Sequence, residues 1–127
     1  MHWLGRYGAQ LTKPRRDEVQ LHSVAARLAR IGELDPRPLT EGRTIDRLLV
    51  GSCRDFSLML TAILRYRGAP TRARCGFPRY SLPDHYEDHW VCEYWNAELQ
   101  RWVLVDSQLD DFQRGVQEWE PVRLRAL

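Results

Sequence analysis

A single stretch that begins at Gly51 restricts the possible folds of this chain more than any other part of the sequence. Gly51 interrupts the chain, and Ser52 and Asp55 then have the spacing of a capping box with Ser52 at the N-cap. A nearly continuous set of apolar residues follows and ends before Gly68, a residue typical of the position after a helix. The pattern predicts a helix over Cys53–Arg67. Because this helix is apolar on most sides, we expect it to be largely buried.

Cys53 falls at the first position of this predicted helix. The positive end of the helix dipole and the free backbone N–H groups there favour a thiolate over a thiol, and the thiolate is the reactive form. A lone cysteine at a helix start is usually a small structural residue. A role as nucleophile therefore requires a base, and a group that orients the base, elsewhere in the chain.

The remaining patterns place helices before strands. An amphipathic helix is predicted over Arg15–Ile31, a loop over Gly32–Gly42 and a short helical turn over Thr44–Leu49. Alternating or β-branched patterns predict three strands, at Thr71–Phe77, His89–Trp95 and Gln100–Val105. A short helix is predicted over Gln108–Glu120. This order favours an α+β fold, with N-terminal helices and a central buried helix packed on an antiparallel sheet.

A hairpin through Asn96–Leu99 joins the last two predicted strands. If its loop is either the two residues Ala97–Glu98 or all four residues Asn96–Leu99, the register places His89 directly opposite Asp106. Opposed residues in an antiparallel pair point to the same side of the sheet, with Cβ atoms about 5 Å apart. The Asp106 carboxylate would then accept a hydrogen bond from one ring nitrogen of His89 and leave the other nitrogen for a second partner. A loop with one residue more or fewer would break this direct pairing.

The sheet face predicted to carry His89 also carries Val91 and Leu104, two apolar residues that need cover. We expect the central helix to dock on this face, because it is the only strongly apolar helix in the sequence. Its N-terminus would then bring Cys53 to His89. The result is a Cys-His-Asp arrangement in which Cys53 is the nucleophile, His89 the base and acid, and Asp106 the orienting group.

A zinc site is the competing interpretation of the same region, with Cys75, His85, His89 and Cys92 as its candidate ligands. His89 and Cys92 are three positions apart on one predicted strand, so their side chains point to opposite faces and do not converge on a metal. Cys75 and Cys92 lie in apolar strand patterns, which is typical of small core residues. The Cys-His-Asp arrangement is therefore favoured.

The composition excludes several classes of protein. The chain has 127 residues, of which 43% are hydrophobic and 28% charged, as expected for one soluble domain. A net charge of +2 does not indicate a nucleic-acid partner, and no apolar run approaches the length of a membrane span. The N-terminus lacks the apolar segment of a signal peptide, and three irregularly spaced cysteines suit free thiols, so we expect a cytoplasmic location.

Four segments together resemble the transglutaminase-like superfamily: Gly51–Phe56, Gly68–Arg74, Asp88–Tyr94 and Trp102–Asp106. The resemblance covers about residues 44–110. It implies a papain-like architecture and a single domain over 1–127 with its core in that range. The nucleophile, base and third member of the family's triad fall on Cys53, His89 and Asp106.

The resemblance also implies acyl chemistry through a thioester, by a transferase, a peptidase or an amidase. The substrate would be a peptide, a protein or a small amide or ester. No cofactor is expected, and nothing in the sequence resembles the calcium sites of the animal enzymes. An oxyanion donor upstream of the nucleophile has only Trp3, Tyr7 and Gln10 as candidates. The chain ends soon after Asp106, which implies a minimal domain or a missing C-terminal part of the sheet. A non-catalytic binding module with the same fold is the alternative function.

Overall fold

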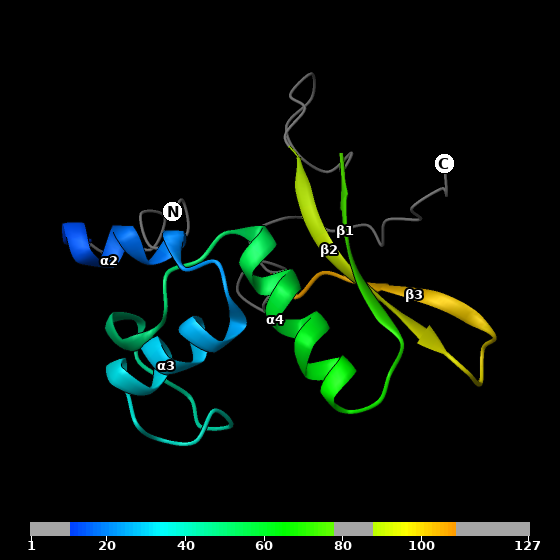
Figure 1. Ribbon diagram of the computed structural model, residues 1–127, viewed down its shortest axis with the longest axis horizontal. Coiled ribbons are helices and arrows are strands. Elements are labelled where there is room, and N and C mark those ends of the chain that lie inside the picture. Colours follow the sequence, from blue (N-terminus) through cyan, green and yellow to red (C-terminus); the bar gives the residue numbers. More distant parts are fainter. Residues whose placement is uncertain (1–10, 78–87, 109–127) are drawn as a thin grey trace.

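The computed structural model describes residues 11–77 and 88–108. The described elements, in chain order, are α2 (Lys13–Asp17), the 3-10 turn η1 (Glu18–Gln20), α3 (Val24–Leu34), the 3-10 turn η2 (Ile45–Arg47), α4 (Cys53–Tyr66), β1 (Thr71–Gly76), β2 (His89–Asn96) and β3 (Arg101–Val105). The three strands form an antiparallel sheet in the order β1-β2-β3. Helix α4 lies between α3 and the sheet (Figure 1). The predicted α+β class is confirmed.

The prediction of a single helix over Arg15–Ile31 is wrong, because the helical conformation is interrupted before Ser23. Ser23 has an extended backbone, and its hydroxyl accepts a hydrogen bond from the backbone N–H of Ala26 at 3.1 Å. It is therefore the N-cap of a new helix, α3, and the residues before it form α2 and η1. Helix α3 also runs on into the loop that was predicted over Gly32–Gly42. The helical turn predicted over Thr44–Leu49 is confirmed as η2.

Helix α4 starts at Cys53 as predicted and ends at Tyr66, one residue before the predicted end. Ser52 is the N-cap, and the Asp55 carboxylate accepts the backbone N–H of Ser52 at 2.8 Å. Cys53 is the first residue of the helix, and Gly68 follows its end with a positive φ of 82°, a conformation that glycine adopts without strain.

The prediction that α4 is largely buried through its apolar side chains is wrong. Its buried residues are Asp55, Ser57 and Thr61, whereas Phe56 and Ile63 are 39% and 49% exposed. The polar stripe is buried because its groups find partners there. The Ser57 hydroxyl donates to the carbonyl oxygen of Trp90 at 2.7 Å, and the Thr61 hydroxyl lies 3.5 Å from the sulfur of Cys92.

The register of the β2–β3 hairpin differs from the predicted one by two residues, and Trp95 pairs with Trp102. The turn occupies residues 97–100, one position later than the predicted loop. The reason is that the Asn96 side chain accepts the backbone N–H groups of Glu98 and Leu99, so that Asn96 itself stays in the strand. Gln100 closes the turn with a φ of 49°. His89 and Asp106 are consequently not directly opposed. A shift of two residues leaves every side chain on its predicted face, so both still project to the same side.

Helix α4 covers the face of the sheet opposite to the one predicted. It packs on Cys92, which is fully buried, and by strand alternation this face is not the one that carries Val91. The expectation that α4 covers Val91 and Leu104 is therefore wrong. Cys92 is a core residue as predicted, whereas Cys75 is exposed and its predicted core position is wrong.

The other face of the sheet carries a cluster of charged and aromatic side chains. Glu93 is buried there and receives hydrogen bonds from Arg72 at 2.8 Å and Arg74 at 2.7 Å. Burial by itself raises the pKa of the Glu93 carboxyl, but the two guanidinium groups outweigh it and hold this pKa below its usual value. The Arg72 guanidinium also stacks 4.2 Å from the ring centre of Trp102.

None of the helices in the described ranges has the length and apolar character needed to cross a lipid bilayer. The short helix predicted over Gln108–Glu120 lies outside the described residues, apart from its first position.

Candidate active site

His89 and Asp106 are in direct contact. The Nε2 atom of His89 lies 2.6 Å from Oδ2 of Asp106, and the two side chains are 17% and 11% exposed. The other oxygen of Asp106 accepts the backbone N–H of Gln108 at 3.0 Å, which fixes the carboxylate in turn. The contact crosses the sheet diagonally, because His89 begins β2 and Asp106 follows the end of β3.

Cys53 completes this arrangement through a hydrogen bond with the His89 side chain. That bond, opposed by partial burial and aided by the backbone N–H groups of Trp90 and Arg54, lowers the pKa of the Cys53 thiol. The structure therefore brings together the three residues that the sequence singled out.

The electrostatics of the site favour a thiolate beside a protonated imidazole. The Asp106 carboxylate, which accepts a hydrogen bond from the His89 ring, is the largest cause that raises the pKa of His89 to about 9, and the interaction with Cys53 is the next. The same contact lowers the pKa of Cys53. Each group thus stabilises the charged form of the other, as in cysteine nucleophiles activated by an adjacent histidine.

The contact between Cys53 and His89 forms at the end of the sheet and not on the face where we expected it. His89 is the first residue of β2 and pairs with Gly76, the last residue of β1, while the pairing of β2 with β3 starts only at Cys92. Helix α4 runs along β2 with its first turn at this end, where Ser57 is bonded to the carbonyl oxygen of Trp90. Helix α4 covers the opposite face of the sheet, and its first residue, Cys53, nevertheless lies beside the His89 imidazole.

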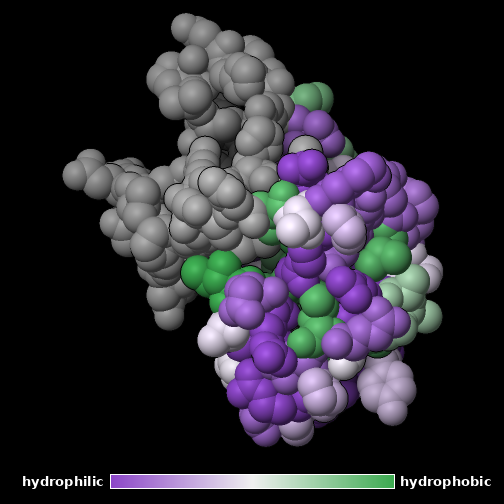
Figure 2. Space-filling model, turned by 90° about the vertical axis from the view of Figure 1, so that its left-hand side faces the viewer, coloured by the Kyte–Doolittle hydropathy of each residue, from purple (hydrophilic) through white to green (hydrophobic). Residues whose placement is uncertain are grey.

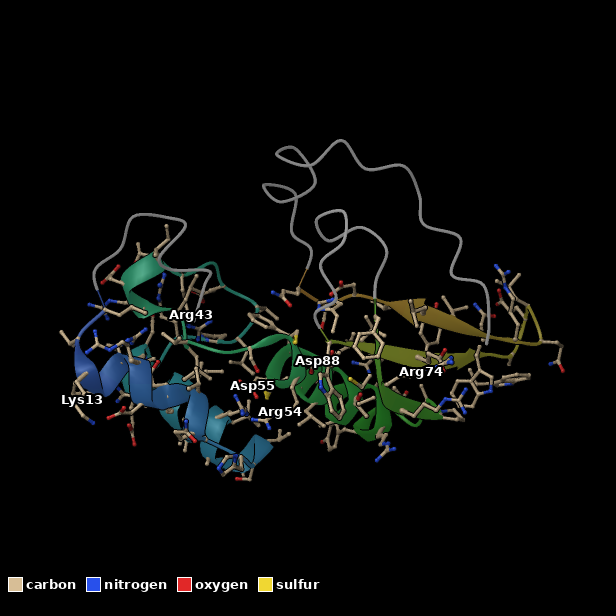
Figure 3. The ribbon with its side chains drawn as sticks, turned by 90° about the horizontal axis from the view of Figure 1, so that it is seen from above. Lys13, Arg43, Arg54, Asp55, Arg74 and Asp88 are labelled. Atoms are coloured by element: carbon tan, nitrogen blue, oxygen red, sulfur yellow. The ribbon has the colours of Figure 1, made fainter. Side chains whose placement is uncertain are left out.

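Helix α3 holds the start of α4 through a buried ion pair that the sequence analysis missed. Nη2 of Arg27 lies 2.6 Å from Oδ1 of Asp55, and the two side chains are 1% and 4% exposed. The other oxygen of Asp55 accepts the backbone N–H of Ser52, the residue directly before Cys53. Figure 3 shows Asp55 and its neighbour Arg54 in the space between α3 and α4.

A second buried carboxylate, that of Glu18, accepts a backbone N–H two residues before Ser52. Glu18 is buried and accepts the backbone N–H of Val50 at 3.0 Å, while Nε of Arg30 donates to its other oxygen at 2.9 Å. Arg27 and Arg30 are one turn apart on α3, so neighbouring arginines of one helix hold the chain on both sides of Gly51. We call the two groups, Arg27–Asp55 and Arg30–Glu18, the arginine clamp.

The sequence offered one signal for the arginine clamp, the i, i+3 spacing of two arginines on a predicted amphipathic helix. That spacing is usual on solvated helix faces. The carboxylates that meet these arginines lie 12 and 28 positions away in the chain, and nothing in a local pattern predicts that pairing.

The candidate zinc ligands do not converge in the part of the chain that the structure describes. Cys75 is exposed, with its sulfur 3.9 Å from Asp88, and Cys92 is buried against Thr61. No group of three or more histidine, cysteine, aspartate or glutamate side chains with metal-binding geometry is found among residues 11–77 and 88–108. His85 lies outside the described residues, as do the oxyanion candidates Trp3, Tyr7 and Gln10.

A comparison with protein families found a match to the one described as the transglutaminase-like superfamily, over residues 8–107. The matched range contains Cys53, His89 and Asp106. It begins well before the core expected at residues 44–110, and it includes α2 and α3 with the arginine clamp. Comparisons with curated proteins and with solved structures found no match.

Proposed function

The chain belongs to the transglutaminase-like superfamily, and from this premise we propose that it catalyses cysteine-dependent acyl transfer or hydrolysis on an amide or ester. Cys53 is the nucleophile, His89 the general base and acid, and Asp106 the group that orients His89. The observation that carries the proposal is the 2.6 Å contact between the His89 imidazole and the Asp106 carboxylate, together with the interaction of His89 with the Cys53 thiol that lowers the pKa of that thiol. The proposed substrate is a peptide, a protein or a small amide or ester.

The proposed reaction has two halves. In the first, the Cys53 thiolate attacks the substrate carbonyl carbon, and the protonated His89 gives its proton to the leaving amine or alcohol as the carbon–nitrogen or carbon–oxygen bond breaks. A thioester on Cys53 remains. In the second, water or an amine attacks the thioester and transfers a proton to His89, and the Cys53 thiolate leaves. Asp106 stays ionised throughout and stabilises the imidazolium.

In both halves of the proposed reaction, negative charge develops on the carbonyl oxygen of the substrate, and hydrogen-bond donors must stabilise it. The backbone N–H of Cys53 lies at the N-terminus of α4, where it has no partner within the helix. It therefore supports a role as one oxyanion donor, aided by the positive end of the helix dipole.

The three cysteines of the chain are free, which supports the proposal that the protein works in a reducing compartment such as the cytoplasm.

A chromogenic ester tests the function directly. We expect p-nitrophenyl acetate to give a burst of p-nitrophenol and a stable acetyl adduct that maps to Cys53 by peptide mass spectrometry. Cys53→Ala should lower the burst rate by at least about a thousandfold without changing the fold, whereas Cys75→Ala, which removes the exposed thiol, should leave the burst intact.

Two results would overturn the proposal. One is an unchanged burst in a folded Cys53→Ala variant. The other is a Cys53 thiol that reacts with iodoacetamide with a midpoint near the ordinary thiol pKa of about 8.5, which would favour a non-catalytic binding module with the same fold.

A further inference from the structure

The face of the sheet that α4 does not cover carries His89 together with a group of charged side chains. His89, Val91 and Glu93 alternate along β2 and project to this face. On β1, Arg74 pairs with Val91 and Arg72 with Glu93, so both arginines project to the same face. Figure 3 shows where Arg74 lies on the sheet. An extended chain that lies along β2 would therefore meet the two arginines and then His89.

Arg72 and Arg74 are held in place by neighbouring side chains. Nε of Arg72 donates to one oxygen of Glu93 at 2.8 Å, and Nη1 of Arg74 donates to the other at 2.7 Å. The Arg72 guanidinium also stacks on Trp102, which is in edge-to-face contact with Trp95. The two guanidinium groups are thus preorganised, which lowers the entropic cost of binding a ligand. By contrast, the side with the N-terminal helices shows small apolar patches among hydrophilic residues (Figure 2).

Both guanidinium groups have donors left for a ligand and are open to solvent. In the part of the chain that the structure describes, no hydrogen bond is made by Nη1 or Nη2 of Arg72 or by Nε or Nη2 of Arg74. The two side chains are 51% and 46% exposed, so a ligand can reach these donors from solvent. Glu93 supplies one negative charge against two positive ones, which leaves one positive charge in excess.

We propose that this face binds a peptide substrate of the candidate site, and that Arg72 and Arg74 recognise an acidic side chain of that peptide. The inference rests on the proposed function, because it concerns the substrate of Cys53. An aspartate or glutamate carboxylate would accept hydrogen bonds from the unused donors and balance the excess charge. Since the arginines lie on a sheet face and not in a closed pocket, a chain can continue past them. This favours an acidic side chain over a chain-terminal carboxylate.

The strand register sets the expected place of the acidic residue in the substrate. Arg74 and Arg72 stand level with the positions two and four residues from His89 along β2. An extended peptide advances by about 3.3 Å per residue, as a strand does, so the acidic residue is expected about two to four positions from the carbonyl that Cys53 attacks. At that separation the negative charges of Cys53 and Asp106 act on it only weakly.

Depsipeptides, in which one ester bond replaces a peptide bond, test the inference with the full-length protein. Two of them carry a glutamate about three positions from the ester, one on the acyl side and one on the alcohol side, so that both directions of the chain are covered. The reference has glutamine at both positions. We expect one of the two glutamate depsipeptides to be hydrolysed with a kcat/KM about fivefold higher than the reference. Because the arginines are half exposed, about 0.5 M NaCl should remove most of this preference.

Variants locate the recognition through the ratio of kcat/KM for the glutamate and glutamine depsipeptides. Each protein is its own reference, so a general loss of activity does not change this ratio. Arg72→Gln and Arg74→Gln each leave Glu93 paired with the other arginine but remove the excess charge, and each should lower the ratio toward unity. Arg101→Gln is the matched control, since Arg101 is an exposed arginine of β3 that projects to the opposite face by strand alternation. It should leave the ratio unchanged.

The inference is overturned if neither glutamate depsipeptide is hydrolysed faster than the reference, or if the preference survives in both arginine variants. A burst with p-nitrophenyl acetate without hydrolysis of any depsipeptide would also overturn it, while the proposed function would stand. Absence of that burst would count against the proposed function itself, and the inference would fall with it. The wild-type ratio decides the question even where a variant fails to fold.

Discussion

Arg27 and Asp55 form an ion pair that is closed to solvent and lies directly behind the first turn of α4, with 2.6 Å between Nη2 and Oδ1. Through its second oxygen, Asp55 also holds the backbone N–H of Ser52. One carboxylate therefore joins α3, the N-cap and the helix that carries Cys53. The pair also bears on the chemistry, since an unpaired negative charge at Asp55, two residues from the thiol, would oppose formation of the thiolate.

Breaking this pair should destabilise the fold. Arg27→Met leaves the Asp55 carboxylate buried without its counter-charge, and we expect it to lower the free energy of unfolding by about 3–5 kcal/mol. Asp55→Asn should also be costly, and the double variant should cost clearly less than the sum of the two, because neither charge is then left alone. Urea denaturation measures all three.

The exposed pair Lys13–Asp17 provides the control for that experiment. It has a similar separation, 2.7 Å, but both side chains are more than half exposed. Lys13→Met should therefore change the free energy of unfolding by less than about 1 kcal/mol. Additive effects of Arg27→Met and Asp55→Asn would show that the two side chains act independently and would contradict the arginine clamp.

The pH dependence of Cys53 alkylation should depend on Asp106. Asp106 is the main cause of the raised pKa of His89, about 9, and the charged imidazole in turn lowers the pKa of Cys53. In Asp106→Asn the pKa of His89 falls toward its usual value of about 6.5, and the pKa of Cys53 rises because its cationic partner is lost sooner as the pH increases. The midpoint of iodoacetamide labelling should therefore move to higher pH.

The same pair of groups sets the expected pH profile of turnover. Acylation needs the Cys53 thiolate together with a protonated His89, so the rate should rise as the pH passes the lowered pKa of Cys53 and fall as it passes about 9.

Alkylation of Cys53 by iodoacetamide is measured best in a Cys75→Ala background, which removes the exposed thiol. Asp88→Asn, next to His89 in the chain, is the matched control. An alkylation midpoint that moves equally in Asp88→Asn and Asp106→Asn would argue against a specific role of Asp106.

Gln100 is the residue of the hairpin turn where a glycine should be more stable. Its φ of 49° lies in the left-handed region, which costs a side chain with a Cβ atom about 1 kcal/mol and costs glycine almost nothing. Gln100→Gly should therefore raise the free energy of unfolding by up to about 1 kcal/mol in thermal or urea denaturation. Ala97→Gly, at the other end of the turn, should give no gain. A loss of stability in Gln100→Gly would mean that the bond from its side chain to the carbonyl of Ala97 matters more than the backbone strain.

The parts of the fold that follow from local chemistry were predictable. Ser52, Asp55 and Gly68 define the ends of α4 through backbone capping, which depends only on neighbours in the chain. Hydrophobic alternation likewise identified the three strands. The prediction that His89 and Asp106 share a face survived a wrong register, because the error was an even number of residues.

The features that escaped prediction depend on partners that are distant in sequence. The Asn96 side chain competes with the strand for backbone N–H groups, and that competition set the register of the hairpin. The buried face of α4 is polar because Ser57 and Thr61 meet groups of β2, so a ranking by hydrophobicity chose the wrong face. Burial of Glu18 and Asp55 requires arginines from α3, and a charged residue in a sequence otherwise indicates exposure.

The arginine clamp shows that the residues of the candidate site and the residues that hold its backbone in place come from different parts of the sequence. The three residues of the candidate site all lie between positions 53 and 106, within a range that looks self-sufficient in the sequence. The backbone on both sides of Gly51 is nevertheless held by Glu18, Arg27 and Arg30. A fragment trimmed to residues 44–110 would keep Cys53, His89 and Asp106 and lose the side chains that hold the backbone before Cys53 in place. The N-terminal helices thus hold the proposed nucleophile in position, and we expect substitutions in them to alter the candidate site although they do not contact it.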